Sequence, residues 1–374
     1  MKELHDILAF YESLKRTGKP CALTSIMKVQ GSTYRRPGAR MLVTGEGKTI
    51  GTISGGCLES DVADKCKKVL ATNQPQTAVY DMTAEDDAAW GLNQGCNGVI
   101  HLLLEPLAPN DAHLDFLAEC LKRKAPGAVA TVFRVDGEFK ASVGTRLMLH
   151  ENGAVQETIR NPALSASLLE ACHEALVTRA SRVKEFRFTE GVVEALIEAV
   201  EPSIPLFVFG AGYDALPLVT LAKELGWEVA VVDHRPAFAS KERFPVADAV
   251  ILARPEDVGA AISLDKRSVA VIMTHNFGHD LELLKTLLPS PVAYIGLLGP
   301  TMRTERLLKN LRHNGFTPTD EQLARLHAPI GIDIGAESPE EIALAILAEI
   351  RAVLSKRSGG FLKNSSGPIH DSRN

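Results

Sequence analysis

A glycine turn between an apolar strand and a helix is the feature that most constrains this chain. The apolar run Leu206 to Phe209 leads directly into Gly210-Ala211-Gly212-Tyr213-Asp214-Ala215. This spacing is the GxGxxA form of the dinucleotide-binding fingerprint. Gly210 permits the tight turn, Gly212 leaves space for a phosphate, and Ala215 lets the helix pack closely on the strand. The turn therefore predicts a nucleotide-like ligand whose phosphate meets the free N–H groups of the helix N-terminus.

Side chains in and near this turn are candidates for ligand contact. Tyr213 and Asp214 lie within it, and Asp233 closes a second apolar run farther along the chain. A carboxylate at the position of Asp233 can accept hydrogen bonds from a ribose, whereas Arg235 can meet an additional phosphate. These two residues indicate different nucleotides, so NAD and NADP both remain alternatives.

Two more polar or glycine-containing segments follow predicted strands in the same half. His275 lies in the segment 274–280, and Gly296 begins a segment that Arg303 follows. Because ligands of doubly wound sheets bind at the carboxyl ends of strands, we expect these three residues near the ligand. The alternative is that the glycines serve tight turns only and that His275 is a capping or solvated side chain.

The order of predicted elements indicates an α/β protein with two domains. Residues 201–205 read as a linker, and beyond them strands alternate with helices, which is typical of a Rossmann-like, doubly wound parallel sheet. A chain of 374 residues is also too long for one ordinary core. We expect an N-terminal mixed α/β domain over 1–200, with its motifs within 1–106 and a mixed extension over 107–200. We expect the Rossmann-like domain over 201–354 and a disordered tail over 355–374.

The N-terminal half carries two loops suited to an anionic ligand. The loop 31–40 combines arginines, among them Arg35 and Arg36, with glycines and hydroxyl side chains. A second glycine turn, Ser54-Gly55-Gly56, opens a predicted helix with Cys57 in its first turn, where a thiol pKa can be lowered. Cys96 lies in a third glycine segment. The alternatives are a solvated basic loop and inert buried thiols.

Composition excludes several classes of function. The net charge of −5 gives no support to a nucleic-acid partner, and no apolar stretch is long enough to span a membrane. The six cysteines show no CxxC or zinc spacing, which is typical of reduced thiols, so we expect a cytoplasmic protein. No Ser-His-Asp triad, Walker lysine or HExxH motif is present, which favours a cofactor-binding role over turnover.

Several long motifs in one order resemble the XdhC/CoxI family of xanthine dehydrogenase accessory factors. The resemblance covers most of residues 1–352 and is carried by segments 31–38, 51–59, 95–98, 209–212, 232–236, 274–275 and 329–336. It implies an N-terminal XdhC/CoxI domain and a C-terminal Rossmann domain. It also implies that the protein binds molybdenum cofactor (molybdopterin), protects it during sulfuration and delivers it to a molybdenum hydroxylase apoenzyme, with a cysteine desulfurase as a further partner. A homodimer is the base-rate expectation.

These observations lead to ranked hypotheses. The first is a molybdenum-cofactor chaperone, the second an NAD(P)-dependent oxidoreductase, and the third a protein that only scaffolds partners. If the first domain handles the metal or its sulfur, Cys57 or Cys96 is a candidate metal contact and at least one of them should face a cleft between the domains.

Overall fold

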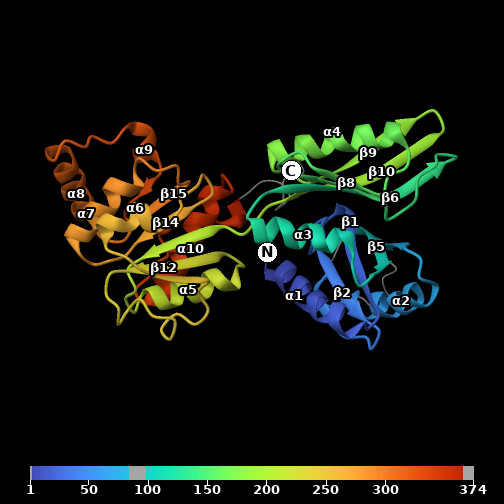
Figure 1. Cartoon of the computed structure of the whole chain (residues 1–374), viewed down its shortest axis with the longest axis horizontal. Helices are drawn as coiled ribbons and strands as arrows, with labels where there is room; N and C mark the ends of the chain where they lie inside the picture. Colours follow the sequence, from blue (N-terminus) through green and yellow to red (C-terminus); the bar gives the residue numbers. More distant parts are fainter. Residues whose placement is uncertain (1, 84–97, 365–374) are drawn as a thin grey trace. The chain divides into compact units, whose positions relative to one another are not determined.

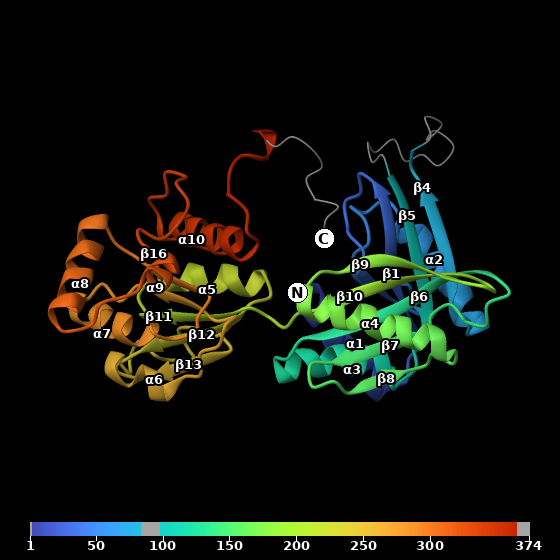
Figure 2. The ribbon, with the colours of Figure 1, turned by 90° about the horizontal axis from the view of Figure 1, so that it is seen from above.

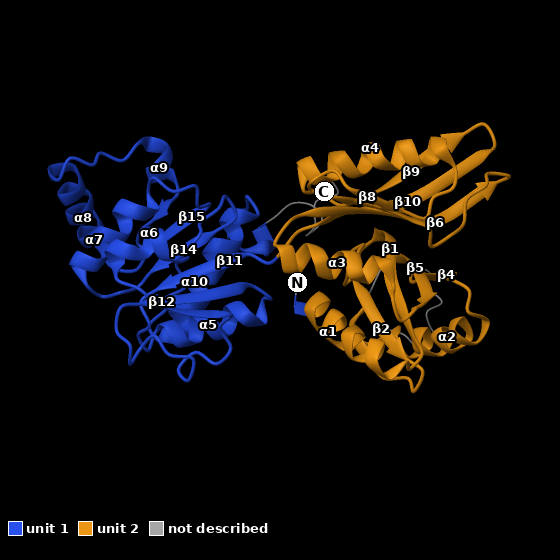
Figure 3. Ribbon diagram, viewed as in Figure 1, with its two compact units in different colours: residues 1–2, 203–365 blue, residues 3–202, 366–374 orange. Residues whose placement is uncertain are grey.

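The computed structural model describes residues 2–83 and 98–364. The chain divides into two compact units, one over 3–202 and the other over 203–365 together with residues 1–2 (Figure 3). They are called the N-terminal and the C-terminal unit below. Within the described residues, no helix is both long and apolar enough to cross a membrane.

The first half of the N-terminal unit forms a five-stranded sheet with strand order β3-β2-β1-β5-β4. All neighbouring strands in it are antiparallel. Its elements are α1 (Lys2–Thr17), β1 (Cys21–Gly31), β2 (Arg40–Thr44), β3 (Thr49–Gly51), α2 (Glu59–Thr72), β4 (Gln76–Asp81) and β5 (Gly98–Pro106) (Figure 1).

The second half of the same unit repeats this topology. Its sheet has the order β8-β7-β6-β10-β9, and its helices occur at the same places in the chain. Its elements are α3 (Ala112–Arg123), β6 (Gly127–Gly137), β7 (Arg146–His150), β8 (Val155–Glu157), α4 (Pro162–Thr178), β9 (Arg182–Phe188) and β10 (Gly191–Val200). The sequence predicts only a mixed extension over 107–200, whereas the structure shows a second copy of the first fold.

Individual residues follow the repeat. The pairs Gly38 and Gly144, Arg40 and Arg146, and Cys66 and Cys172 are separated by one constant interval. Both glycines have left-handed backbone, with φ of +90° and +85°, and both precede the arginine that begins the next strand. The N-terminal unit is therefore an internal duplication.

Each copy packs a helix on its sheet through alternating apolar residues. Helix α2 shares a buried core with β1, β2 and β5, and α4 shares one with β6, β7 and β10. The opposite sheet faces meet around Met27, Leu103, Phe133 and Leu196, and α1 and α3 share a third core with residues of both sheets. The two copies therefore bury one common interior.

The C-terminal unit is a six-stranded parallel sheet with order β13-β12-β11-β14-β15-β16, as the sequence predicts for a Rossmann domain. One core joins the sheet to α5 and α10, and a second joins the other face to α7 and α8 (Figure 2). The elements are β11 (Pro205–Phe209), α5 (Ala215–Glu224), β12 (Glu228–Asp233), β13 (Ala249–Leu252), η2 (Pro255–Asp257), α6 (Val258–Ala261), β14 (Val269–Ile272), α7 (Phe277–Leu287), β15 (Tyr294–Leu297), α8 (Thr301–His313), α9 (Asp320–Ala324), β16 (Leu326–His327), α10 (Pro339–Leu354) and η3 (Leu362–Asn364).

The chain reverses direction across the sheet between β11 and β14. From β11 it proceeds through β12 to β13 on one side, then returns to β14, β15 and β16 on the other. Such a switch point leaves a crevice at the carboxyl ends of the central strands, where ligands of this fold bind. The glycine turn after β11 lies at this edge.

Candidate functional site

The turn after β11 requires glycine at its first position. Gly210 has φ of +109°, and a Cβ there would lie 2.5 Å from the backbone oxygen of Met273. The N–H of Gly210 donates to Val232 O at 2.9 Å, and the N–H of Met273 donates to Phe209 O at 2.9 Å. The turn is therefore fixed between the two neighbouring strands, as the fingerprint predicts.

Asp233 at the end of β12 holds this turn in place. Its carboxylate accepts the N–H of Ala211 at 2.7 Å, the N–H of Arg235 at 2.9 Å, and Nε and Nη2 of Arg235 at 2.9 and 2.7 Å. Burial raises the pKa of Asp233, but the hydrogen bonds from Arg235 and Ala211 outweigh it and lower the pKa to about 2. Asp233 thus uses its oxygens within the protein, which competes with its predicted role as a ribose acceptor.

Asp214 contacts a histidine beside the turn. Its Oδ2 lies 2.7 Å from Nε2 of His275, which is in the loop after β14. Its Oδ1 would lie 2.6 Å from a Cβ at Gly212. His275 itself has φ of +56°, an uncommon backbone conformation for a histidine. The structure therefore brings three predicted residues together and places a carboxylate where the fingerprint leads us to expect a phosphate.

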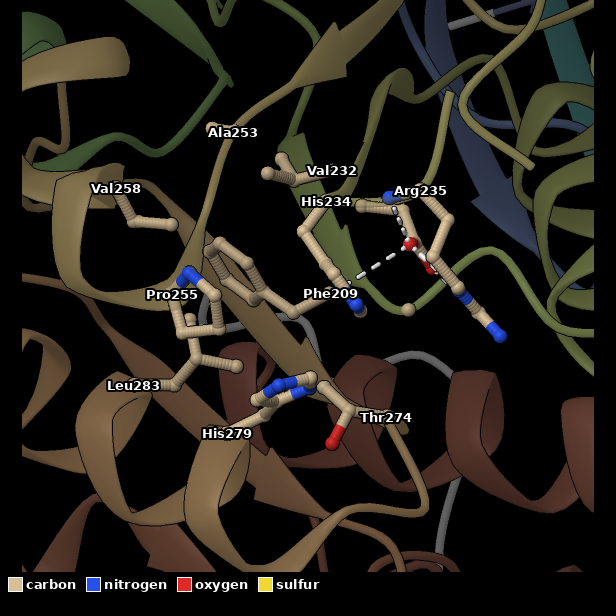
Figure 4. A pocket seen from close by; sticks show the side chains of 12 residues that line it. Phe209, Val232, His234, Arg235, Ala253, Pro255, Val258, Thr274, His279 and Leu283 are labelled. Carbon is tan, nitrogen blue, oxygen red and sulfur yellow. Dashed lines mark hydrogen bonds and ion pairs between the residues drawn. The ribbon is translucent and has the colours of Figure 1, made fainter. Parts of the chain in front are cut away.

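A narrow pocket opens next to the turn, between the ends of β12, β13 and β14 (Figure 4). One wall is apolar and includes Phe209, Pro255 and Leu283. The polar residues at the pocket include His234 and His279, whose rings meet edge to face with centroids 4.5 Å apart. Apolar walls with a few polar side chains are typical of small-molecule sites. Neither histidine is named as a site residue in the sequence analysis, although His234 follows Asp233 directly and His279 lies within the segment 274–280.

The other two predicted residues of this unit have packing partners. Gly296 lies inside β15, where a Cβ would come within 2.0 Å of Ile330 Cδ1. Arg303 on α8 donates Nε and Nη2 to Asp280 at 3.1 and 2.6 Å. Asp280 in turn accepts Thr274 Oγ1. Both residues thus stabilise the strand ends, and their predicted ligand contact stays a prediction.

The basic loop of the N-terminal unit is engaged in ion pairs. Arg35 Nη2 donates to both oxygens of Glu3, at 2.8 and 2.7 Å. Arg36 lies in the same loop, and its carbonyl accepts the N–H of Ala39 at 3.1 Å. Arg40 at the end of the loop pairs with Glu198. Arg35 and Arg40 therefore have structural roles, and the predicted anion contact of this loop stays a prediction.

The second glycine turn is capped by its own side chains. Ser54 Oγ and the Glu59 carboxylate bond each other, and Glu59 also accepts the N–H of Ser54 at 2.8 Å. Leu58 N–H donates to both, at 3.2 Å each. Beyond their chain neighbours, no atom of the described residues lies within 4 Å of a Cβ placed at Gly55 or Gly56. The hydrogen bonds of Ser54 and Glu59 therefore fix the conformation of the turn.

Cys57 is half-buried and lies two residues before α2 begins, instead of in its first turn as the sequence predicts. Cys96 lies outside the described residues. The role of both thiols stays a prediction, as does their place in a cleft.

The parallel sheet, its glycine turn and the strand order define a protein with a Rossmann domain. Residues 206–350 match the family described as XdhC Rossmann domain, and residues 14–81 and 120–187 match the XdhC and CoxI family. These last two ranges fall on the two copies of the duplicated unit. The chain belongs to the XdhC and CoxI family.

Individual relatives agree with this assignment. A protein of Bacillus subtilis (strain 168), named as a probable subunit of xanthine dehydrogenase, is 33% identical over 352 residues, covering 94% of this chain and 97% of that protein. Molybdenum cofactor insertion chaperone PaoD of Escherichia coli (strain K12) is 23% identical over 352 residues, covering 93% and 87%. A crystal structure from Bacillus halodurans, described as a xanthine dehydrogenase, is 31% identical, covers 96% of this chain and 97% of that one, and has a TM-score of 0.76.

Proposed function

We propose that this protein binds molybdenum cofactor at the Rossmann turn and delivers it to a xanthine dehydrogenase-type molybdenum hydroxylase. The observation that carries the proposal is similarity to a molybdenum cofactor insertion chaperone over most of both chains, combined with a Rossmann turn that, among the described residues, has free N–H donors beside a narrow pocket. The protein would pass the cofactor on without transforming it. It therefore needs a site that binds the cofactor reversibly, and it does not need a set of catalytic residues.

The chemistry of the cargo matches the donors at the site. Molybdenum cofactor consists of a pterin, a phosphate and a dithiolene that holds the metal. Within the described residues, the N–H groups of Gly212 and Tyr213 have no acceptor, so they are available to a phosphate. The pocket lined by Phe209, His234 and His279 lies next to these donors and offers aromatic and polar side chains to the pterin.

Further steps belong to the same proposal. Sulfuration of the bound cofactor would require a sulfur donor, for which a cysteine desulfurase is the expected partner. Cys57 and Cys96 are the candidate thiols for holding metal or sulfur, and replacing either with serine tests this role by cofactor transfer. A homodimer is the expected assembly, which light scattering of the purified protein tests.

Transfer to a client enzyme tests the chaperone function. Protein loaded anaerobically with released cofactor is mixed with a cofactor-free molybdenum hydroxylase, and the molybdenum content and activity of the re-isolated hydroxylase are measured. We expect faster activation than with the same amount of free cofactor. Equal rates with and without the protein would contradict delivery.

NAD(P)-dependent oxidation or reduction is the second candidate function. The strand order of the parallel sheet favours it. It predicts stoichiometric binding of NAD or NADP and a change in nicotinamide absorbance with substrate. If neither NAD nor NADP binds in calorimetric titration, this candidate function is excluded.

A further inference from the structure

Arg243 lies beside the glycine turn, in the loop between β12 and β13, and no sequence motif points to it. Its Nη2 is 3.5 Å from the carbonyl oxygen of Ala211, a distance too long for a strong hydrogen bond. The guanidinium carbon lies 4.9 Å from the ring centre of Phe238 and 5.6 Å from that of Tyr213. Two aromatic rings thus hold a cation against the turn.

The other basic side chains beside the turn already contact carboxylates. Arg235 gives its Nε and Nη2 to Asp233, and His275 faces Asp214. Among the ion pairs of the described residues, none includes Arg243, and its Nε is buried without a hydrogen-bond partner. Of these three side chains, Arg243 alone contacts no carboxylate among the described residues, so its charge is available for a ligand.

Free backbone donors lie next to this side chain. Ala211 O, which Arg243 approaches, belongs to the residue that precedes Gly212, and Tyr213 follows Gly212 directly. The N–H groups of Gly212 and Tyr213 have no acceptor in the described part of the chain. An arginine and two adjacent amides are the donor set that binds a phosphate in proteins.

We propose that Arg243 is the side chain that binds the phosphate of the ligand, together with the N–H groups of Gly212 and Tyr213. This inference rests on the proposed function, because the phosphate is that of the cofactor bound at the same turn. It assigns the ligand to the class of phosphate esters and distinguishes Arg243 from Arg235, which the fingerprint suggests for this role. Arg235 instead anchors Asp233.

The charges around the turn determine on which side of it the phosphate binds. The Asp214 carboxylate lies against Gly212, with its other oxygen 2.7 Å from Nε2 of His275, and it repels an anion. Arg243 provides the compensating attraction, and its stacked rings keep it in place before the ligand arrives.

The test compares Arg243→Ala and Arg243→Lys with Arg312→Ala. Arg312 is an exposed residue in the last turn of α8, so its loss removes the same charge from the same unit. Full-length proteins are checked for unchanged thermal unfolding, and their affinity for released molybdenum cofactor is measured under anaerobic, reducing conditions. We expect Arg243→Ala to bind about 10- to 100-fold more weakly, consistent with one lost charge-assisted hydrogen bond, and Arg243→Lys to recover part of this loss.

The outcomes separate the two proposals. If the native protein binds cofactor and Arg243→Ala binds as tightly as Arg312→Ala, the role of Arg243 is overturned while the proposed function stands. If the native protein itself binds no cofactor, the proposed function and this inference both fail. Inorganic phosphate added as a competitor gives a second readout, because it should weaken cofactor binding in the native protein and have less effect in Arg243→Ala.

Discussion

The carboxylate of Asp233 accepts the backbone N–H of Ala211 at 2.7 Å, and so ties the end of β12 to the glycine turn after β11. The side chain is 2% exposed, and its second partner is the guanidinium of Arg235. An acidic residue at this position usually serves the ligand. In this chain it fixes the conformation of the turn.

Replacing this carboxylate should destabilise the C-terminal unit. Because the folded-state pKa of Asp233 is lowered to about 2 from 3.8, the ionised form contributes about 2 kcal/mol of stability above pH 3.8. This contribution is lost as the pH falls through 2. We expect Asp233→Asn to lower the free energy of unfolding at pH 7 by at least this amount, measured by denaturant titration. An unchanged midpoint would contradict the role given to Asp233.

Two reciprocal ion pairs should stabilise the duplicated unit. Arg40 of the first copy donates Nη2 to both oxygens of Glu198 in the second, at 2.9 and 2.8 Å. Arg146 of the second copy pairs with Glu105 of the first, and all four side chains are at most 10% exposed. Breaking a buried ion pair leaves an uncompensated charge, so Arg40→Met should lower the free energy of unfolding by about 3–5 kcal/mol.

The double variant Arg40→Met with Glu198→Leu provides the control. It removes both charges, so it should recover much of the stability lost in the single variant. Chemical denaturation of the native protein, the two single variants Arg40→Met and Glu198→Leu, and the double variant gives the coupling energy of the pair. Strict additivity of the two single substitutions would show that the pair contributes no specific interaction.

A buried histidine should make the same unit sensitive to acid. Burial lowers the pKa of His113 well below 6.5, and the charges of Arg146 and Arg40 lower it further. Below pH 6.5 the unfolded chain therefore takes up a proton that the folded chain does not, so stability falls as the pH drops. The repeat counterpart of His113 is Ile7, which is also buried. Between pH 7 and 5, we expect His113→Ile to lose about 1–2 kcal/mol less stability than the native protein, measured by unfolding at each pH. Parallel pH profiles would count against this explanation.

Removing the negative charge at the turn should favour an anionic ligand. The Asp214 carboxylate lies against Gly212, where a bound phosphate would be repelled. We expect Asp214→Asn to bind molybdenum cofactor about three- to tenfold more tightly, because one unfavourable charge interaction is lost. Tighter binding should disappear at high salt, where such interactions are screened. Weaker binding at every salt concentration would mean that Asp214 contacts the ligand favourably.

The C-terminal unit was predictable because its signals are local. The apolar runs that lead to Phe209 and Asp233, each followed by turn residues, mark strands whose parallel order the structure confirms. The roles of Asp233 and Arg235 were not predictable. From the sequence, both side chains could contact a ligand. The structure shows that they form hydrogen bonds with each other instead.

The duplication of the N-terminal unit is hidden in the sequence for a different reason. The second copy keeps Gly144, Arg146 and Cys172 but has no counterpart of the Ser54-Gly55-Gly56-Cys57 turn. The shared positions are scattered, and the structure relates them through packing and the exchanged ion pairs. Arg243 was not predictable either, because it lies in an irregular loop where no periodicity marks its approach to the turn.

Retention of cofactor by the glycine turn is the decisive measurement. The native protein and Gly212→Asp are incubated with released molybdenum cofactor under reducing, anaerobic conditions and passed over a sizing column, and molybdenum and pterin are measured in the protein peak. The substitution places a second carboxylate in the turn. We expect near-stoichiometric co-elution of molybdenum and pterin with the native protein and loss of both from a folded Gly212→Asp variant. Absence of both from the native protein, or equal retention by the two proteins, would contradict binding at this turn.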